Sequence, residues 1–89
     1  MKLVLIEWVD SAQPLSAWCF LDDLPASDVV HCRSVGWLVG NSRDVKILAP
    51  NIGDLKGGGS AQGSGFIRIP SKAITRLVEL REVKNERRR

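Results

Sequence analysis

Three short apolar runs in the second half of the chain constrain its fold more than any other feature. They span residues 34–39, 45–48 and 66–70, and turn-forming residues separate them. Short apolar runs between turn residues are typical of antiparallel strands. We therefore predict a mostly β protein, a small antiparallel barrel with a short helical turn and a basic C-terminal tail.

The first half of the chain continues the strand pattern less regularly. Residues 2–9 predict a first strand that ends at Asp10, and residues 17–21 predict a short second strand or an extended segment. The apolar pattern from Val29 to Val39 predicts one long strand that bends at Gly36, through a bulge or a close backbone approach. Asn, Ser and Asp in residues 41–44 predict a hairpin turn.

In the last third of the chain, composition predicts a loop, and the spacing of apolar residues bears on the choice between a helix and a strand. Residues 57–65 are rich in Gly and Ser and predict a mobile loop; a strand rather than a helix follows them, which argues against phosphate binding. From Ser71 onward the apolar residues Ile74, Leu77 and Leu80 recur every third residue, which matches neither a helix nor a strand. A helical turn followed by a closing strand is favoured over a single helix.

Length and charge bound the organisation of the chain. With 89 residues we expect one small domain over residues 1–80 and a basic tail over residues 81–89. Residues 1–80 carry eight basic and eight acidic side chains, so the net charge of +3 comes from the tail. The apolar runs are too short for a membrane span and the N-terminus does not resemble a secretory signal, so we expect a cytoplasmic protein.

The chemistry expected of this composition is not enzymatic. The chain has one His, no Tyr and no nucleophile motif, and the adjacent Asp22 and Asp23 are typical of a solvated turn. His31 and Cys32 are neighbours on a predicted strand, where successive side chains point to opposite faces, so they do not form a metal site with Cys19. We expect no cofactor and no metal, and two free thiols buried in a reducing cytosol.

Candidate binding residues come from one Trp and a set of cations. Trp8 and Trp37 lie inside predicted strands and are assigned to the core, whereas Trp18 follows a polar loop and is the best candidate of the three for partial exposure. If Val45, Ile47, Ile67 and Ile69 face inward, strand alternation places Lys46 and Arg68 outside. The predicted binding residues are Trp18, Lys46, Arg68, Lys72, Arg76, Arg87, Arg88 and Arg89. A solvated, charge-balanced face and a solubilising tail remain the alternative reading of the cations.

Four segments resemble short, uncharacterised proteins encoded by tailed phages and prophages. They are residues 8–11, 34–39, 45–49 and 67–74, which carry Trp-x-Asp-Ser, Val-Gly-Trp and Ile-Pro-x-x-Ala-Ile. The resemblance implies a non-enzymatic phage accessory protein that binds a host macromolecule, chiefly a host protein, and inhibits a defence or regulatory system. A nucleic-acid-binding protein and a minor virion or assembly component, with homo-oligomers included, are the alternatives.

A looser resemblance connects the chain to SH3-like and Sm-like barrels. The bent hairpin over residues 29–48 and the apolar residues Ala73 and Ile74 are similar to the central hairpin and closing strand of those barrels. The chain lacks their usual N-terminal helix and RNA-binding signature, so the resemblance supports the barrel more strongly than ring assembly or RNA binding.

Overall fold

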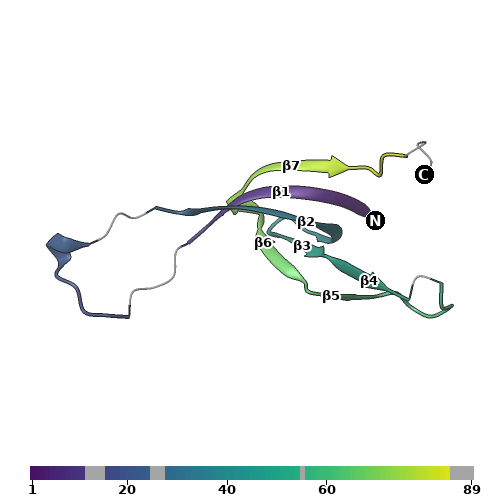
Figure 1. The fold of residues 1–89 in the computed structure, drawn as a ribbon, viewed down its shortest axis with the longest axis horizontal. Coiled ribbons are helices and arrows are strands. Elements are labelled where there is room, and N and C mark those ends of the chain that lie inside the picture. Colours follow the sequence, from purple (N-terminus) through teal and green to yellow (C-terminus); the bar gives the residue numbers. More distant parts are fainter. Residues whose placement is uncertain (12–15, 25–27, 55, 85–89) are drawn as a thin grey trace, which may run out of the picture.

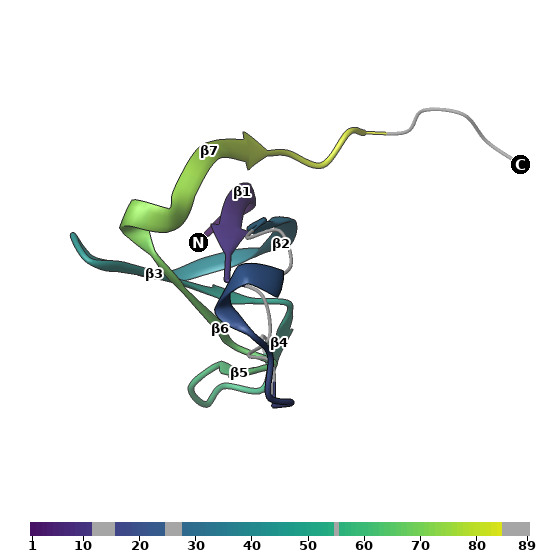
Figure 2. The ribbon, with the colours of Figure 1, turned by 90° about the vertical axis from the view of Figure 1, so that its left-hand side faces the viewer.

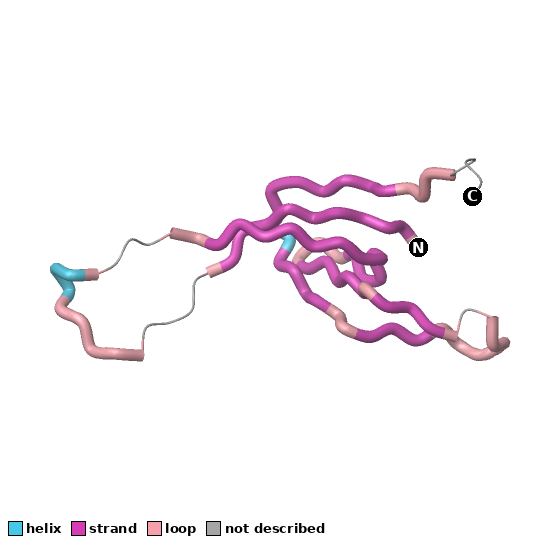
Figure 3. The backbone as a smooth tube through the Cα atoms, in the orientation of Figure 1, coloured by secondary structure: helices cyan, strands magenta, loops and turns pink. Residues whose placement is uncertain are grey.

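The computed structural model describes residues 1–11, 16–24, 28–54 and 56–84 (Figures 1 and 3). Within them the chain forms strands and two short 3-10 helices, which confirms the prediction of a mostly β, antiparallel protein. The elements are β1 (Lys2–Asp10), η1 (Leu21–Asp23), β2 (Val30–Asn41), β3 (Val45–Ala49), β4 (Asn51–Gly53), β5 (Gln62–Ser64), β6 (Ile67–Pro70), η2 (Ser71–Ala73) and β7 (Ile74–Leu80). No helix in this part of the chain is long and apolar enough to cross a bilayer.

Five strands make one antiparallel sheet in the order β6-β3-β2-β1-β7, and β4 and β5 make a separate two-stranded sheet. Figure 2 shows the larger sheet end-on as a strongly curved layer. The predicted barrel is not closed, because β6 and β7 lie at opposite edges of the sheet. β6 has only four residues and ends at Pro70, which has no N–H to donate, and η2 then carries the chain across to the other edge.

One face of the larger sheet carries a small core. Val4 and Ile6 of β1, Leu48 of β3 and Ile69 of β6 are fully buried and form one cluster. Trp8 packs against this cluster, and its indole Nε1 donates a hydrogen bond to Ser34 Oγ at 3.1 Å. The core placement of Trp8 is therefore confirmed, and its polar N–H has a partner within the sheet.

The predicted faces of β3 were wrong by one residue. Residues directly opposite each other in antiparallel strands share a face, and Lys46 lies opposite Ile69 whereas Ile47 lies opposite Arg68. Since Ile69 is in the core, Lys46 lies on the core face at the end of β3, and Ile47 and Arg68 lie on the other face. A bulge between Leu38 and Gly40 of β2 shifts the register at this hairpin.

The assignment of Trp37 to the core was also wrong. Trp37 lies opposite Leu3, one residue away from the buried Val4, so its indole is on the face opposite the core and is only half-buried. Gly36, beside it, lies on the core face, where a Cβ atom would come within 3.0 Å of the Ala49 carbonyl oxygen. The predicted close backbone approach at Gly36 is thus confirmed, and the bulge lies three residues later.

The remaining local predictions are mostly confirmed. Ser42 closes the hairpin turn between β2 and β3, where its backbone N–H donates to the Val45 carbonyl at 3.0 Å. The turn followed by a closing strand after Ser71 appears as η2 and β7. The glycine-rich segment is shorter as a loop than predicted, because Gln62–Ser64 pairs with Asn51–Gly53.

The structure departs most from a compact domain between β1 and β2. Residues 11–29 are here called the arm, and those of them that the structure describes lie beyond the end of the β1–β2 hairpin, away from both sheets (Figure 1). The radius of gyration is 18.4 Å, against about 12 Å for a compact domain of this length. The second strand predicted over residues 17–21 is absent: residues 16–20 are irregular and η1 follows them.

Candidate protein-binding site

The tip of the arm is an exposed cluster of large apolar side chains. Trp18 is fully exposed, Phe20 and Leu21 are about four-fifths exposed (81% and 82%), and Leu24 is 59% exposed. The predicted exposure of Trp18 is confirmed. Single exposed apolar residues are common on protein surfaces, but several together mark a contact surface. Aromatic residues at such surfaces are frequent anchors of protein–protein contacts.

The backbone at the tip is held by a turn rather than by packing. The backbone N–H of Asp23 donates to the Phe20 carbonyl at 2.9 Å, and the Cys19 thiol donates to the carbonyls of Phe20 and Asp23 at 3.3 and 3.5 Å. Trp18, Cys19, Phe20 and Asp23 line an open, mainly apolar pocket of about 380 Å³. These contacts shape the tip locally while leaving its apolar side chains free for a partner.

Charge separates the arm from the rest of the chain. Residues 11–29 contain three acidic side chains and no basic one, so the arm has a net charge of −3. The other residues carry 13 basic and seven acidic side chains, a net charge of +6. The tip itself carries Asp22 and Asp23 in η1. A partner for the tip is therefore expected to combine apolar and basic groups.

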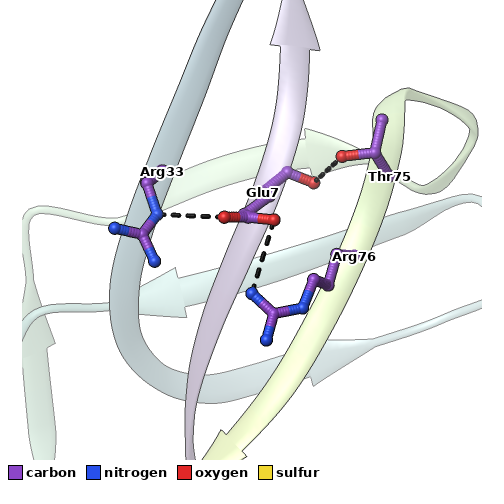
Figure 4. Close-up of polar contacts among 4 residues, drawn as sticks. All are labelled: Glu7, Arg33, Thr75 and Arg76. Carbon is purple, nitrogen blue, oxygen red and sulfur yellow. Dashed lines mark hydrogen bonds and ion pairs between the residues drawn. The ribbon is translucent and has the colours of Figure 1, made fainter.

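A charged row crosses the sheet near the base of the arm. Glu7 of β1 lies directly opposite Arg33 of β2 on one side and Arg76 of β7 on the other. Its carboxylate accepts from Arg33 Nε at 3.1 Å and lies 3.5 Å from Arg76 Nη1 (Figure 4). The Glu7 carbonyl accepts from Thr75 Oγ1 at 3.1 Å. The row has two positive charges and one negative charge, and it leaves one excess positive charge on this face.

The Glu7 row is expected to contribute little to stability. Glu7→Gln should lower the free energy of unfolding by no more than about 0.4–2 kcal/mol, because it breaks two ion pairs and an exposed ion pair is worth about 0.2–1 kcal/mol. The loss should shrink at high salt, and urea unfolding at two salt concentrations measures it. The matched control is Glu79→Gln, which removes the single exposed pair with Lys2 and should cost less. A salt-independent loss of several kcal/mol would contradict this account.

The predicted basic binding residues do not form one face. Lys46 donates to Asn41 Oδ1 on the core face, and Arg68 lies on the opposite face of β6. Arg76 is at the other edge of the sheet, in contact with Glu7, and Lys72 is exposed in η2. Arg87, Arg88 and Arg89 lie outside the described residues. The structure therefore does not bring the predicted cations Lys46, Arg68, Lys72 and Arg76 into a shared basic patch.

The cysteines and the histidine are separated as well. Cys19 is exposed in the arm, whereas Cys32 is half-buried in β2, so the prediction of two buried thiols was wrong for Cys19. Cys32 lies opposite Trp8 and His31 opposite Val9, which puts their side chains on different faces of the sheet. Within the described residues no group of three potential ligands is close enough to hold a metal ion.

A second apolar surface was missed by the sequence reading. On the face opposite the core, cross-strand neighbours form two rows over β2, β1 and β7: Trp37, Leu3, Leu80 and Val35, Leu5, Val78. None of these side chains is fully buried, and Val35 is 53% exposed. We call these six residues the outer face. The sequence pattern that could have predicted the outer face lies in β1. From Leu3 to Ile6 every residue is apolar, so apolar side chains point to both faces of the strand.

Comparisons with protein-family models, curated proteins and solved structures find no match for this chain.

Proposed function

We propose that this chain is a non-enzymatic protein that acts by binding another protein through the tip of its arm. The observation that carries the proposal is the exposed cluster of Trp18, Phe20, Leu21 and Leu24 on an arm that projects from the sheet. An apolar cluster of this kind is costly in water unless a partner covers it.

The resemblance to phage proteins supplies the proposed setting. In that setting the chain is a phage or prophage accessory protein in the bacterial cytoplasm. Its protein partner belongs to the host, as in inhibition of a defence or regulatory system, or to the phage particle during assembly. The two edge strands of the larger sheet, β6 and β7, support the assembly role in particular. Each of them is paired with another strand on one side only in the described structure. Free edges can receive a further strand.

We also propose that the fold of this chain is an open version of the SH3-like and Sm-like barrels. Its support is the strand order, in which β7 closes beside β1 after the short helix η2, and the bent β2–β3 hairpin. In such a sheet, the long loop between the first two strands of the meander is a natural place for an insertion. The arm occupies that position.

The experiment is a pull-down from bacterial lysate with the immobilised protein, followed by mass spectrometry. Trp18→Ala is expected to lose the captured protein at least about tenfold, as a central aromatic anchor does. The control is Val83→Ala, which removes an apolar side chain that is 90% exposed but lies beyond β7. Both variants should unfold at the wild-type temperature, because neither side chain is packed.

Capture that is unchanged in Trp18→Ala, or reduced equally in Trp18→Ala and Val83→Ala, would overturn the proposal. Nucleic acid in the eluate, with affinity that falls steeply as salt rises, would instead favour the nucleic-acid-binding alternative. Under that alternative, removal of Lys84 to Arg89 separates binding by the tail from binding by Lys46, Arg68, Lys72 or Arg76.

A further inference from the structure

The same chain carries two apolar surfaces with no partner in the described structure. One is the tip of the arm, and the other is the outer face of the sheet. They lie at different ends of the β1–β2 hairpin: the arm continues beyond Asp10 and Val30, whereas the row of Trp37, Leu3 and Leu80 lies near the N-terminal end of β1. Figure 1 shows the tip beyond the end of the sheet, at a distance from β7.

The two surfaces are complementary in charge as well as in polarity. The tip presents Asp22 and Asp23 next to its apolar cluster. The outer face is flanked by the row of Arg33, Glu7 and Arg76, which has one excess positive charge on the same face. Opposite potentials on two surfaces align them on encounter and select against other orientations. An apolar, acidic tip therefore fits an apolar, basic face.

We infer that the tip of the arm docks on the outer face of a second copy of this chain, so that the protein self-associates head to tail. This inference rests on the proposed function, because it names the protein that the arm binds. The contact uses different surfaces on the two copies and therefore either closes into a ring or continues as an open chain. Apolar side chains of the tip cover Val35, Leu5 and Val78, and its carboxylates face Arg33 and Arg76.

The contact area expected between the tip and the outer face is small, so the self-association should be weak and visible only as concentration rises. Trp18 and Phe20 together would bury about 300–500 Å², at about 150–250 Å² for each aromatic side chain. This is below the roughly 800 Å² per partner of a standard stable interface. Each copy, however, makes two such contacts, one with its tip and one with its outer face. Assembly should therefore appear in a concentration series rather than as a permanent dimer.

The test is analytical ultracentrifugation of the full chain over a concentration series. The wild type should exceed its monomer mass of 9.8 kDa increasingly as concentration rises. An arm variant, Trp18→Ala with Phe20→Ala, and a face variant, Val35→Glu, should each remain monomeric. Val35 is exposed enough for this change to leave the fold intact, which circular dichroism checks; Trp37→Ala is a second face variant.

Mixing the two variants distinguishes a head-to-tail contact from the other arrangements. The arm variant retains an intact face and the face variant retains an intact tip, so their mixture should form a 1:1 dimer that does not grow. Self-association of the arm variant alone would mean that faces pair with faces, and self-association of the face variant alone would mean that tips pair with tips. Either result overturns the inference.

Two further outcomes separate this inference from the proposed function. A wild type that is monomeric at every concentration overturns the head-to-tail contact, whether the arm folds onto its own sheet or stays free. If Trp18→Ala still loses a captured protein in that case, the proposed function stands with a different partner.

Reversal of the tip charge, Asp22→Lys with Asp23→Lys, should weaken self-association at least about tenfold. Unchanged association of this variant would also overturn the inference.

Discussion

Ile6→Ala is expected to remove a large part of the stability of this protein. Ile6 is fully buried at the centre of the core, between Val4 and Trp8 on the same face of β1. Truncation of a buried Ile to Ala costs about 2–5 kcal/mol, because apolar contacts are lost and a cavity remains. A domain of this length has a total stability of about 4–13 kcal/mol. Urea unfolding followed by Trp fluorescence measures the loss.

The matched control is Leu5→Ala, which makes a similar truncation one residue away on the outer face. Leu5 is only half-buried, so its truncation should cost at least about 1 kcal/mol less than that of Ile6. The comparison is made at low protein concentration, where self-association does not cover the outer face. Equal losses for the two variants would show that the two faces of β1 are packed alike.

Gly36→Val is expected to cause a loss of similar size by the opposite mechanism. An added Cβ would lie 3.0 Å from the Ala49 carbonyl oxygen and 3.2 Å from Leu48 Cβ. Both atoms belong to the neighbouring strand β3, and Leu48 and Ala49 are fully buried, so neither can move away cheaply. Overpacking of a core costs about 1–3 kcal/mol or more. The same urea measurement should show it, with weakened pairing of β2 and β3.

Gly53→Val provides the control for Gly36→Val. Gly53 is also a strand residue, but the nearest atom to an added Cβ is the Gln62 carbonyl oxygen at 4.0 Å. Val favours extended backbone and reduces the freedom of the unfolded chain, so this variant should be neutral or slightly stabilising. A destabilisation as large as that of Gly36→Val would mean that loss of glycine itself, rather than contact with β3, causes the effect.

The sequence alone located most strands because the signals for them are local. Turn residues end the apolar runs at Asp10 and after Asn41, and Pro70 ends β6, so the bounds of β1, β2, β3 and β6 could be predicted closely. The choice between a helix and a strand after Ser71 was also made correctly. The exposure of Trp18 followed from its position after a polar loop. Each of these features depends on a few neighbouring residues.

The faces of the strands were decided only by the tertiary structure. In β3, Val45 and Ile47 alternate with Lys46 and Leu48, so apolar residues occupy both sets of positions and alternation cannot choose between them. The bulge between Leu38 and Gly40 makes that choice through the pairing of β2 with β3. A shift of one residue exchanges the faces of a strand, which is why Lys46 and Arg68 separate. Trp37 lies outside the core because it pairs with Leu3 rather than with the buried Val4.

The position of the arm was likewise beyond the reach of local signals. Residues 16–24 have an apolar content that suits a strand, but a strand forms only where a neighbouring strand accepts its hydrogen bonds. The long β1–β2 pairing places these residues beyond the end of the sheet, where none of the described strands is beside them. Sequence therefore determined where strands can form, and long-range pairing decided which apolar side chains the core covers and which remain for a partner.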